Sequence, residues 1–143
     1  MDYFNSFAIS ASGLMVEKLR METAALNLAN ANSTAAAGSE PFSALTVVSQ
    51  PTDVFESFLT EGGEAPTTAV SAVLEPRIGA PRLVHDPAHP HADANGFVSY
   101  ANVDTLSEMM TMMRATRAYE ANIKAINAAK AMAQQALDIG SSK

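Results

Sequence analysis

The seven prolines of this chain constrain its fold most, because all of them fall between residues 41 and 90. Proline lacks a backbone donor and clashes with the preceding helical turn, so long helices are excluded from that region. The proline-free ends remain available for helices. The sequence therefore predicts three parts: an N-terminal helix in 1–32, a middle segment in 33–102 and a long C-terminal helix in 103–143.

Residues 4 to 30 have an amphipathic helical pattern. Residues on one stripe alternate three and four positions apart, with one interruption at Lys18, which is a heptad spacing. Other apolar residues lie off this stripe, so the helix has apolar surface for more than one neighbour. Gly13 costs about 1 kcal/mol relative to alanine unless close packing requires it. The stripe consists of Phe4, Phe7, Ala11, Leu14, Lys18, Met21, Ala25 and Leu28.

Residues 103 to 139 give the strongest helical pattern. Thr105 and Glu108 match a capping box, Asp104 adds negative charge at the helix start, and Gly140 is placed to end the helix. At 1.5 Å per residue the helix would be about 50 Å long, too long for a compact domain of this size to cover. Its stripe consists of Met109, Met112, Thr116, Tyr119, Ile123, Ile126, Lys130, Ala133 and Leu137.

The middle segment has short runs with β character at 45–48, 70–74 and 97–100. The stretch 60–68 is rich in glycine, threonine and glutamate and is predicted to be a mobile loop. We therefore expect extended chain with a few short strands and no independent core.

The predicted fold is mainly α, with the two terminal helices packed as a coiled-coil-like hairpin and an extended middle carrying short β-strands. The chain has no Trp and only 6% aromatic residues, so few bulky side chains are available to fill a thick core. Two helices of unequal length leave apolar surface bare, which favours association with copies or relatives. A head-to-tail contact of this kind gives an open helical array when the rotation does not close.

Composition argues against several functions. The net charge of −6 makes a nucleic-acid partner improbable on electrostatic grounds. We expect no membrane span, since no stretch approaches about 20 apolar residues. The N-terminus does not have the basic and apolar pattern of a cleaved signal peptide. The sequence also contains no cysteine, no glycine-rich phosphate loop and no evident nucleophile–base pair, so no catalytic or cofactor-binding residues are predicted and the chain is not expected to be an enzyme.

Three histidines, with Asp86 and Asp93, raise the question of a metal site: His85, His89 and His91. Zinc needs three or four converging ligands, and Pro87 and Pro90 prevent a convergent helical spacing. A proline-rich turn is the better interpretation, and no metal site is predicted.

Two terminal motifs make the sequence more specific. SASGL at 10–14 followed by NLANANST at 27–34 resembles the N-terminal signature of flagellar rod and hook proteins. NVD at 102–104, EMM at 108–110 and RAYEAN at 117–122 resemble the matching C-terminal signature. The middle segment is short for the family, and residues 86–98 resemble a stretch typical of its proximal-rod members. Residues 50–80 match no motif.

This resemblance implies a structural subunit of the flagellar basal-body rod, a hollow drive shaft in the periplasm. It implies export through the flagellar type III apparatus without a cleaved signal. The implied partners are copies of the chain, adjoining rod proteins and the hook–basal body protein FliE.

The residues expected to pack between subunits lie on the helix stripes and in the middle segment. On the N-terminal helix they are Phe4, Phe7, Ala11, Leu14, Met21, Ala25, Asn27, Leu28 and Asn30. On the C-terminal helix they are Met109, Met112, Tyr119, Asn122, Ile123, Ile126, Ala133 and Leu137. The middle-segment residues are Asp86, Pro87, His89, Pro90, Ala92, Asp93, Gly96 and Phe97.

The helical asparagines have two interpretations, solvated surface or hydrogen bonds across a helix contact that fix register. The resemblance favours the second for Asn27, Asn30 and Asn122. Two alternatives for the whole chain remain at this point: another rod subunit of the same family, or a helical adaptor or chaperone of a secretion system.

Overall fold

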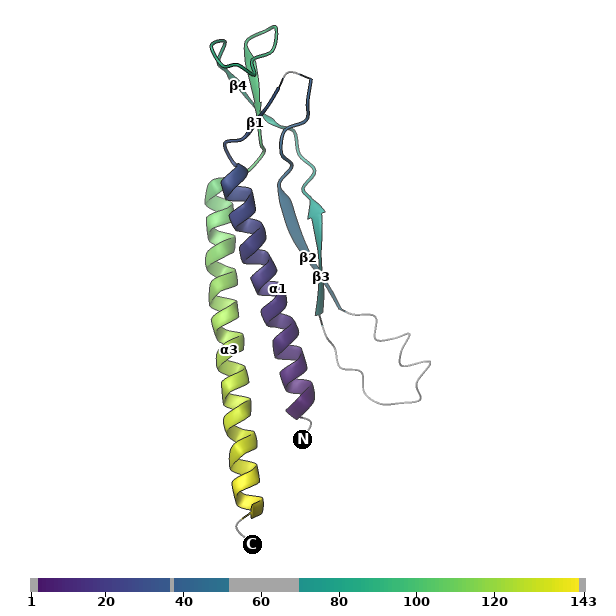
Figure 1. The fold of residues 1–143 in the computed structure, drawn as a ribbon, viewed down its shortest axis with the longest axis vertical. Helices are drawn as coiled ribbons and strands as arrows, with labels where there is room; N and C mark the ends of the chain where they lie inside the picture. The colour runs from purple at the N-terminus through teal and green to yellow at the C-terminus, as the bar shows by residue number, and fades with distance from the viewer. Residues whose placement is uncertain (1–2, 37, 52–69, 142–143) are drawn as a thin grey trace, which may run out of the picture. The chain divides into compact units, whose positions relative to one another are not determined.

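The computed structural model describes residues 3–36, 38–51 and 70–141, and the side chains of 7–36, 38–50 and 70–139. The predicted loop at 60–68 and the side chain of Phe4 lie outside these ranges. The described residues form two long helices and several short strands (Figure 1). In chain order these are α1 (Tyr3–Asn30), β1 (Thr34–Ala35), β2 (Leu45–Pro51), β3 (Val70–Pro76), β4 (Arg82–His85), β5 (Phe97–Tyr100) and α3 (Thr105–Ser141).

The mainly helical prediction is confirmed, and each of the three predicted β runs lies within a strand, β2, β3 or β5. Two strands were not predicted. β1 has only two residues, and β4 directly follows Pro81, where the sequence signal for a strand is interrupted.

The predicted capping box of α3 is wrong. Asp104 is the cap: its Oδ1 accepts a hydrogen bond from the Leu106 N–H at 3.1 Å, and its carbonyl accepts the first intrahelical bond from Glu108 N at 3.0 Å. This is the geometry of an N-cap aspartate. The Glu108 side chain turns instead to Asn27 and Arg77. At the other end α3 continues through Gly140 to Ser141, so Gly140 does not end the helix.

The chain divides into two compact units. The helical unit contains residues 1–19, 49–73 and 114–143, and the mixed unit contains 20–48 and 74–113.

The mixed unit contains a three-stranded antiparallel sheet in the order β1-β5-β4. β5 is central, and its Tyr100 lies opposite Thr34 of β1 and Arg82 of β4. Val98 of β5 is fully buried, whereas Phe97, the residue before it in the strand, faces the other side and is exposed. Because successive side chains of a strand point to opposite faces, Val98 marks the covered face of the sheet and Phe97 marks the exposed face.

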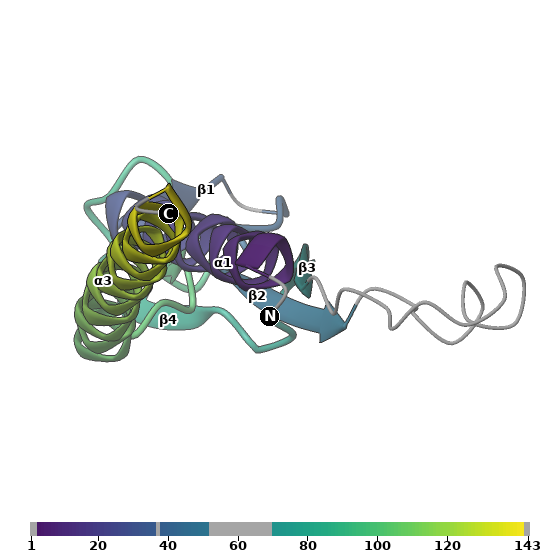
Figure 2. The same cartoon turned by 90° about the horizontal axis from the view of Figure 1, so that it is seen from below.

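In the helical unit, α1 and α3 lie side by side and run antiparallel (Figures 1 and 2). A Cβ placed on Gly13 would lie 2.9 Å from Nδ2 of Asn122, so the two helices approach closely there and the glycine is a packing requirement. Ser12 Oγ also accepts a hydrogen bond from the Val70 N–H at 3.3 Å, which joins the start of β3 to α1.

Most of the buried side chains belong to the mixed unit. They are small or polar for the most part: Thr23, Ala24, Asn27, Ala31, Ala44, Val98, Ala101 and Glu108. In the described part of the helical unit only Val16 and Ala115 are buried. The packing is therefore thin, as expected for an alanine-rich chain with few aromatic residues.

Replacing Asp104 with alanine should lower the free energy of unfolding by about 1 kcal/mol, because the Leu106 N–H loses its cap. Urea unfolding followed by circular dichroism measures this. Asp104→Asn preserves a capping oxygen and should be nearly neutral. If Thr105→Ala lowered the free energy of unfolding more than Asp104→Ala, Thr105 would be the cap and the assignment of Asp104 would be wrong.

Candidate functional site

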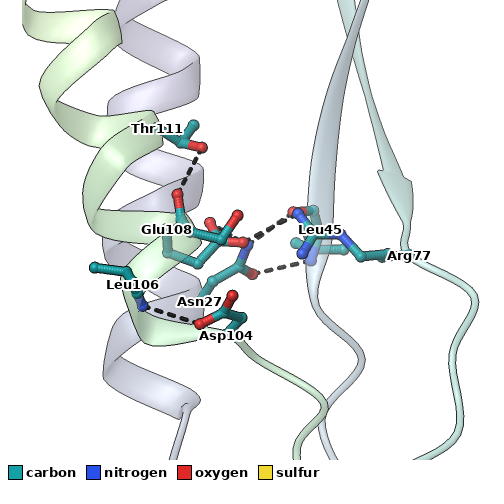
Figure 3. Close-up of polar contacts among 8 residues, drawn as sticks. Asn27, Leu45, Arg77, Asp104, Leu106, Glu108 and Thr111 are labelled. Carbon is teal, nitrogen blue, oxygen red and sulfur yellow. Dashed lines mark hydrogen bonds and ion pairs between the residues drawn. The ribbon is translucent and has the colours of Figure 1, made fainter.

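A buried polar cluster connects four segments of the mixed unit, and we call it the Asn27 cluster: Asn27, Leu45, Arg77 and Glu108 (Figure 3). Asn27, near the end of α1, is fully buried. Its Nδ2 donates to the Leu45 carbonyl at 2.8 Å, and its Oδ1 accepts from the Leu45 N–H at 2.9 Å. One amide side chain thus satisfies both backbone groups at the start of β2.

The Asn27 amide also reaches α3. Nδ2 donates to Oε2 of Glu108 at 3.1 Å, while Arg77 Nη2 donates to Oε1 of the same carboxylate at 3.0 Å. The Glu108 side chain is 3% exposed and that of Arg77 is 42% exposed. A buried carboxylate is tolerated only when it is paired and hydrogen-bonded, and both of its oxygens have partners here.

Arg77 is held in place by its backbone as well. Its N–H donates to the Ala44 carbonyl at 2.6 Å, next to Leu45, so the chain after β3 is fastened beside the start of β2. Among the described side chains, no buried nitrogen or oxygen is without a partner. The cluster is therefore a satisfied polar core that fixes how α1, α3 and the two strands meet.

The side chains of the predicted stripe on α1 are only partly shielded from solvent. Ala11 and Ala25 are exposed, while the larger members are half-buried: Phe7, Leu14, Met21 and Leu28. Of the two α1 asparagines predicted to fix register, Asn27 bonds across elements, whereas Asn30 donates to the Leu26 carbonyl of its own helix at 2.9 Å.

The predicted stripe on α3 is likewise divided. Met109, Ile123 and Leu137 are exposed, and Met112, Tyr119, Asn122, Ile126 and Ala133 are half-buried. The less exposed positions form a row with three- and four-residue steps that also includes Glu108, Ala115 and Ala129. The sequence pattern predicts five members of this row and misses Glu108, Ala115 and Ala129, because a glutamate and small alanines occupy those three positions.

The predicted middle-segment residues form a self-contained turn. Asp93 Oδ1 accepts hydrogen bonds from the N–H groups of Asn95 and Phe97, each at 2.8 Å, and the Asp86 N–H donates to the Gly96 carbonyl at 2.9 Å. Gly96 has a φ of 80°, and a Cβ there would meet Pro87 and His85 at 3.0 and 3.1 Å. The aspartates and the glycine of this motif thus have local structural roles.

The remaining motif residues surround this turn. His89 Nδ1 accepts from the His91 N–H at 3.1 Å, and the His89 carbonyl accepts from the Ala92 N–H at 3.0 Å. His91 bonds through Nδ1 to Thr34 of β1 at 2.9 Å, which ties the turn to the sheet. Pro87 and Pro90 are exposed. In the described part of the chain, no group of three or more His, Cys, Asp or Glu side chains is arranged to hold a metal ion.

None of the helices described is long and apolar enough to cross a membrane.

Comparison with known proteins identifies the class. Residues 94–139 match the family model described as the C-terminal region of flagellar basal-body rod FlgEFG proteins. Flagellar basal-body rod protein FlgC of Salmonella typhimurium is 39% identical over 141 residues, covering 98% of this chain and 99% of that protein. FlgC of Aquifex aeolicus is 40% identical over 131 residues, 91% of each chain, and FlgC of Bacillus subtilis is 36% identical over 149 residues, with 98% and 99% covered.

Two terminal helices around a short strand-containing middle, together with these matches, define a flagellar basal-body rod protein. More particularly, the chain belongs to the FlgC family. The assignment that the sequence segment 86–98 favoured is thereby confirmed. The chain is a structural rod protein and not an enzyme.

The roles of Asn27 and Asn30 can be separated by mutation. Asn27→Leu should lower the free energy of unfolding by about 2 to 4 kcal/mol, because it leaves the Leu45 backbone groups unpaired and the buried Glu108 with one partner fewer. The matched variant Asn30→Leu should cost less than about 0.5 kcal/mol, since its amide bonds only within an exposed helical turn. Urea unfolding measures both values. If the two variants lowered the free energy of unfolding equally, the Asn27 cluster would not be what holds the mixed unit together.

Proposed function

We propose that this chain polymerises through its two terminal helices, with copies of itself and adjoining rod proteins, into the proximal part of the flagellar rod. It forms part of a hollow shaft that transmits torque, and FliE is a further neighbour. The subunit lies in the periplasm and reaches it through the flagellar type III export apparatus without a cleaved signal peptide.

The observation that carries this proposal is the exposure of large apolar side chains along the helices. On α3, Leu137 is 73% exposed and Ile139 is 76% exposed; on α1, Met15 is 75% exposed. Near the start of α3, a second exposed group is spaced at i, i+3, i+4 and i+7: Leu106, Met109, Met110 and Met113. Such faces favour association, because covering them removes apolar surface from water.

The helix register supports a coiled-coil-like hairpin with a free end. Gly13 lies against Asn122 in the helical unit, and Asn27 bonds to Glu108 in the mixed unit. The spacing is fourteen residues on each helix, from 13 to 27 and from 108 to 122, which is two heptads. We count ten residues from the Gly13–Asn122 contact, toward the start of α1 and toward the end of α3. This count places Tyr3 level with Met132. Residues 133–139 of α3 therefore lie beyond the level of Tyr3, and we infer that a neighbouring subunit packs against them.

Replacing Leu137 and Ile139 together with serine should abolish or greatly reduce rod assembly and leave the isolated chain folded. Both side chains are exposed, so the free energy of unfolding should change by less than about 0.5 kcal/mol per site. Swarming in soft agar and electron microscopy of basal bodies, in cells whose only copy is the variant, measure assembly.

The control for this pair is Gln134→Ser with Gln135→Ser, which alters exposed polar positions on the same helical turns. The control variant should swarm normally. Normal swarming of the Leu137/Ile139 variant would contradict the proposal that this end of α3 packs against a neighbour.

Asn122→Leu tests whether the asparagine opposite Gly13 fixes the helix register. A leucine there should crowd Gly13 and loosen the specificity of assembly, giving fewer complete rods and reduced swarming. Asn127→Leu, at an exposed position of the same helix, is the control. Unchanged motility and rod assembly for Asn122→Leu would refute the register role.

A further inference from the structure

The basic side chains of the described residues fall into two groups. Those outside α3 each interact with another group: Lys18, Arg20, Arg77 and Arg82. Those on α3 form no hydrogen bond or ion pair with another described residue: Arg114, Arg117, Lys124 and Lys130. The unpaired positive charge of the described residues is therefore concentrated on this one helix.

Three of these bases lie on the same side of α3. Arg114, Arg117 and Lys124 are separated by three and seven residues, and at about 100° per residue a helix holds them within about 80° of one another. Lys124 follows Asn122, which faces Gly13 of α1, by two residues, or about 200° around the helix. The three bases, which we call the basic face, are thus turned away from α1.

The basic face is open and keeps its charge. Its three side chains are exposed, and Glu120, the acid beside them, forms no ion pair with any described residue. Three bases and one acid leave a formal charge of +2. Ala121, between Arg117 and Lys124, is exposed and small, so another chain can approach the helix surface closely at that point.

The sequence contains a segment of opposite charge. Residues 52–69 include four acids and no Lys or Arg, which gives a formal charge of −4: Asp53, Glu56, Glu61 and Glu64. This segment lies outside the described residues, and its charge follows from its sequence. Opposite charges of this size attract each other over distances up to the Debye length of the solution. The basic face and the acidic segment are therefore complementary in charge.

A neighbouring copy is better placed than the same chain to supply the acidic segment. Within one chain, the residue that follows the segment is Val70, whose N–H donates to Ser12 Oγ of α1 at 3.3 Å. The basic face is on the side of α3 turned away from α1. Every copy in an assembly carries both the face and the segment, so one head-to-tail contact can repeat from subunit to subunit.

We propose that the basic face of α3 binds the acidic segment 52–69 of a neighbouring copy in the rod. Carboxylates of the segment pair with the guanidinium groups of Arg114 and Arg117 and with the ammonium group of Lys124. Exposed ion pairs are individually weak, so this contact selects the neighbour and its register more than it holds the rod together. The inference rests on the proposed assembly and names the two surfaces of one of its contacts.

The test is a charge-reversal cycle in cells whose only copy is the variant, read by swarming in soft agar and electron microscopy of basal bodies. Arg117→Glu with Lys124→Glu changes the face from +2 to −2 and should reduce the swarm diameter to less than about half, because like charges then meet. Glu56→Lys, Glu61→Lys and Glu64→Lys together change the segment from −4 to +2 and should have the same effect. The two sets combined should restore swarming, which a defect in folding or export would not allow.

A control and a second measurement accompany the cycle. Lys130→Glu reverses a base about 120° around the same helix from Lys124 and should swarm normally. Ala121→Cys and Ala65→Cys in one chain should give a ladder of cross-linked copies after mild oxidation of isolated basal bodies, since the chain has no cysteine of its own. Either cysteine alone should give no ladder.

Four results would each overturn the inference: normal swarming of the Arg117→Glu, Lys124→Glu variant, failure of the combined sets to restore swarming, an equal defect for Lys130→Glu, or cross-links confined to single chains. None of them bears on whether the chain builds a rod. Absence of the unaltered chain from isolated basal bodies would instead contradict the proposed assembly.

Discussion

Glu108 is a carboxylate buried in a small chain, and the arrangement of the mixed unit depends on how that charge is satisfied. Asn27 from α1 and Arg77 from the chain after β3 each take one of its oxygens, and Asn27 simultaneously pairs with both backbone groups of Leu45. Four segments far apart in the sequence therefore meet at one point. Hydrogen bonds of this kind are directional, so they specify one arrangement where a core of alanines would accept several.

The small size of the other buried residues explains why such a cluster is needed. Among the described side chains, the buried apolar ones are alanines and two valines, which bring backbones close together but supply little apolar area. In the helical unit, Gly13 and Asn122 also bring two helix backbones close together, while long apolar side chains such as Met15 and Leu137 are exposed. In the proposed assembly, polar contacts fix the arrangement inside the mixed unit, and the exposed apolar side chains are left for neighbouring subunits.

Proline placement and heptad spacing were sufficient to predict both helices, and short runs with β character predicted three strands, because these features act locally along the chain. Only part of the less exposed row of α3 could be predicted the same way. Its members Glu108 and Ala115 are detected by no apolar pattern, and the partners of Glu108 lie in segments brought together only by the fold. The same limit explains the wrong prediction of the capping box. Glu108 fits a capping box in sequence, but in the fold its carboxylate binds the amide of Asn27 and the guanidinium of Arg77 instead of the backbone at the helix start. The aspartates and glycine at 86–96 were recognised as a motif, yet their role as turn residues became clear only from their hydrogen bonds.

The central claim is that the exposed faces of the helices are covered when the rod assembles, and the chain's own methionines can report on it. Oxidation of Met15, Met109, Met113 and Met132 by dilute peroxide, read by mass spectrometry, should be compared between the free chain and isolated basal bodies. All four are more than half exposed in the free chain. The account predicts rapid oxidation of the free chain and marked protection in basal bodies, and equal oxidation of all four methionines in both states would contradict it.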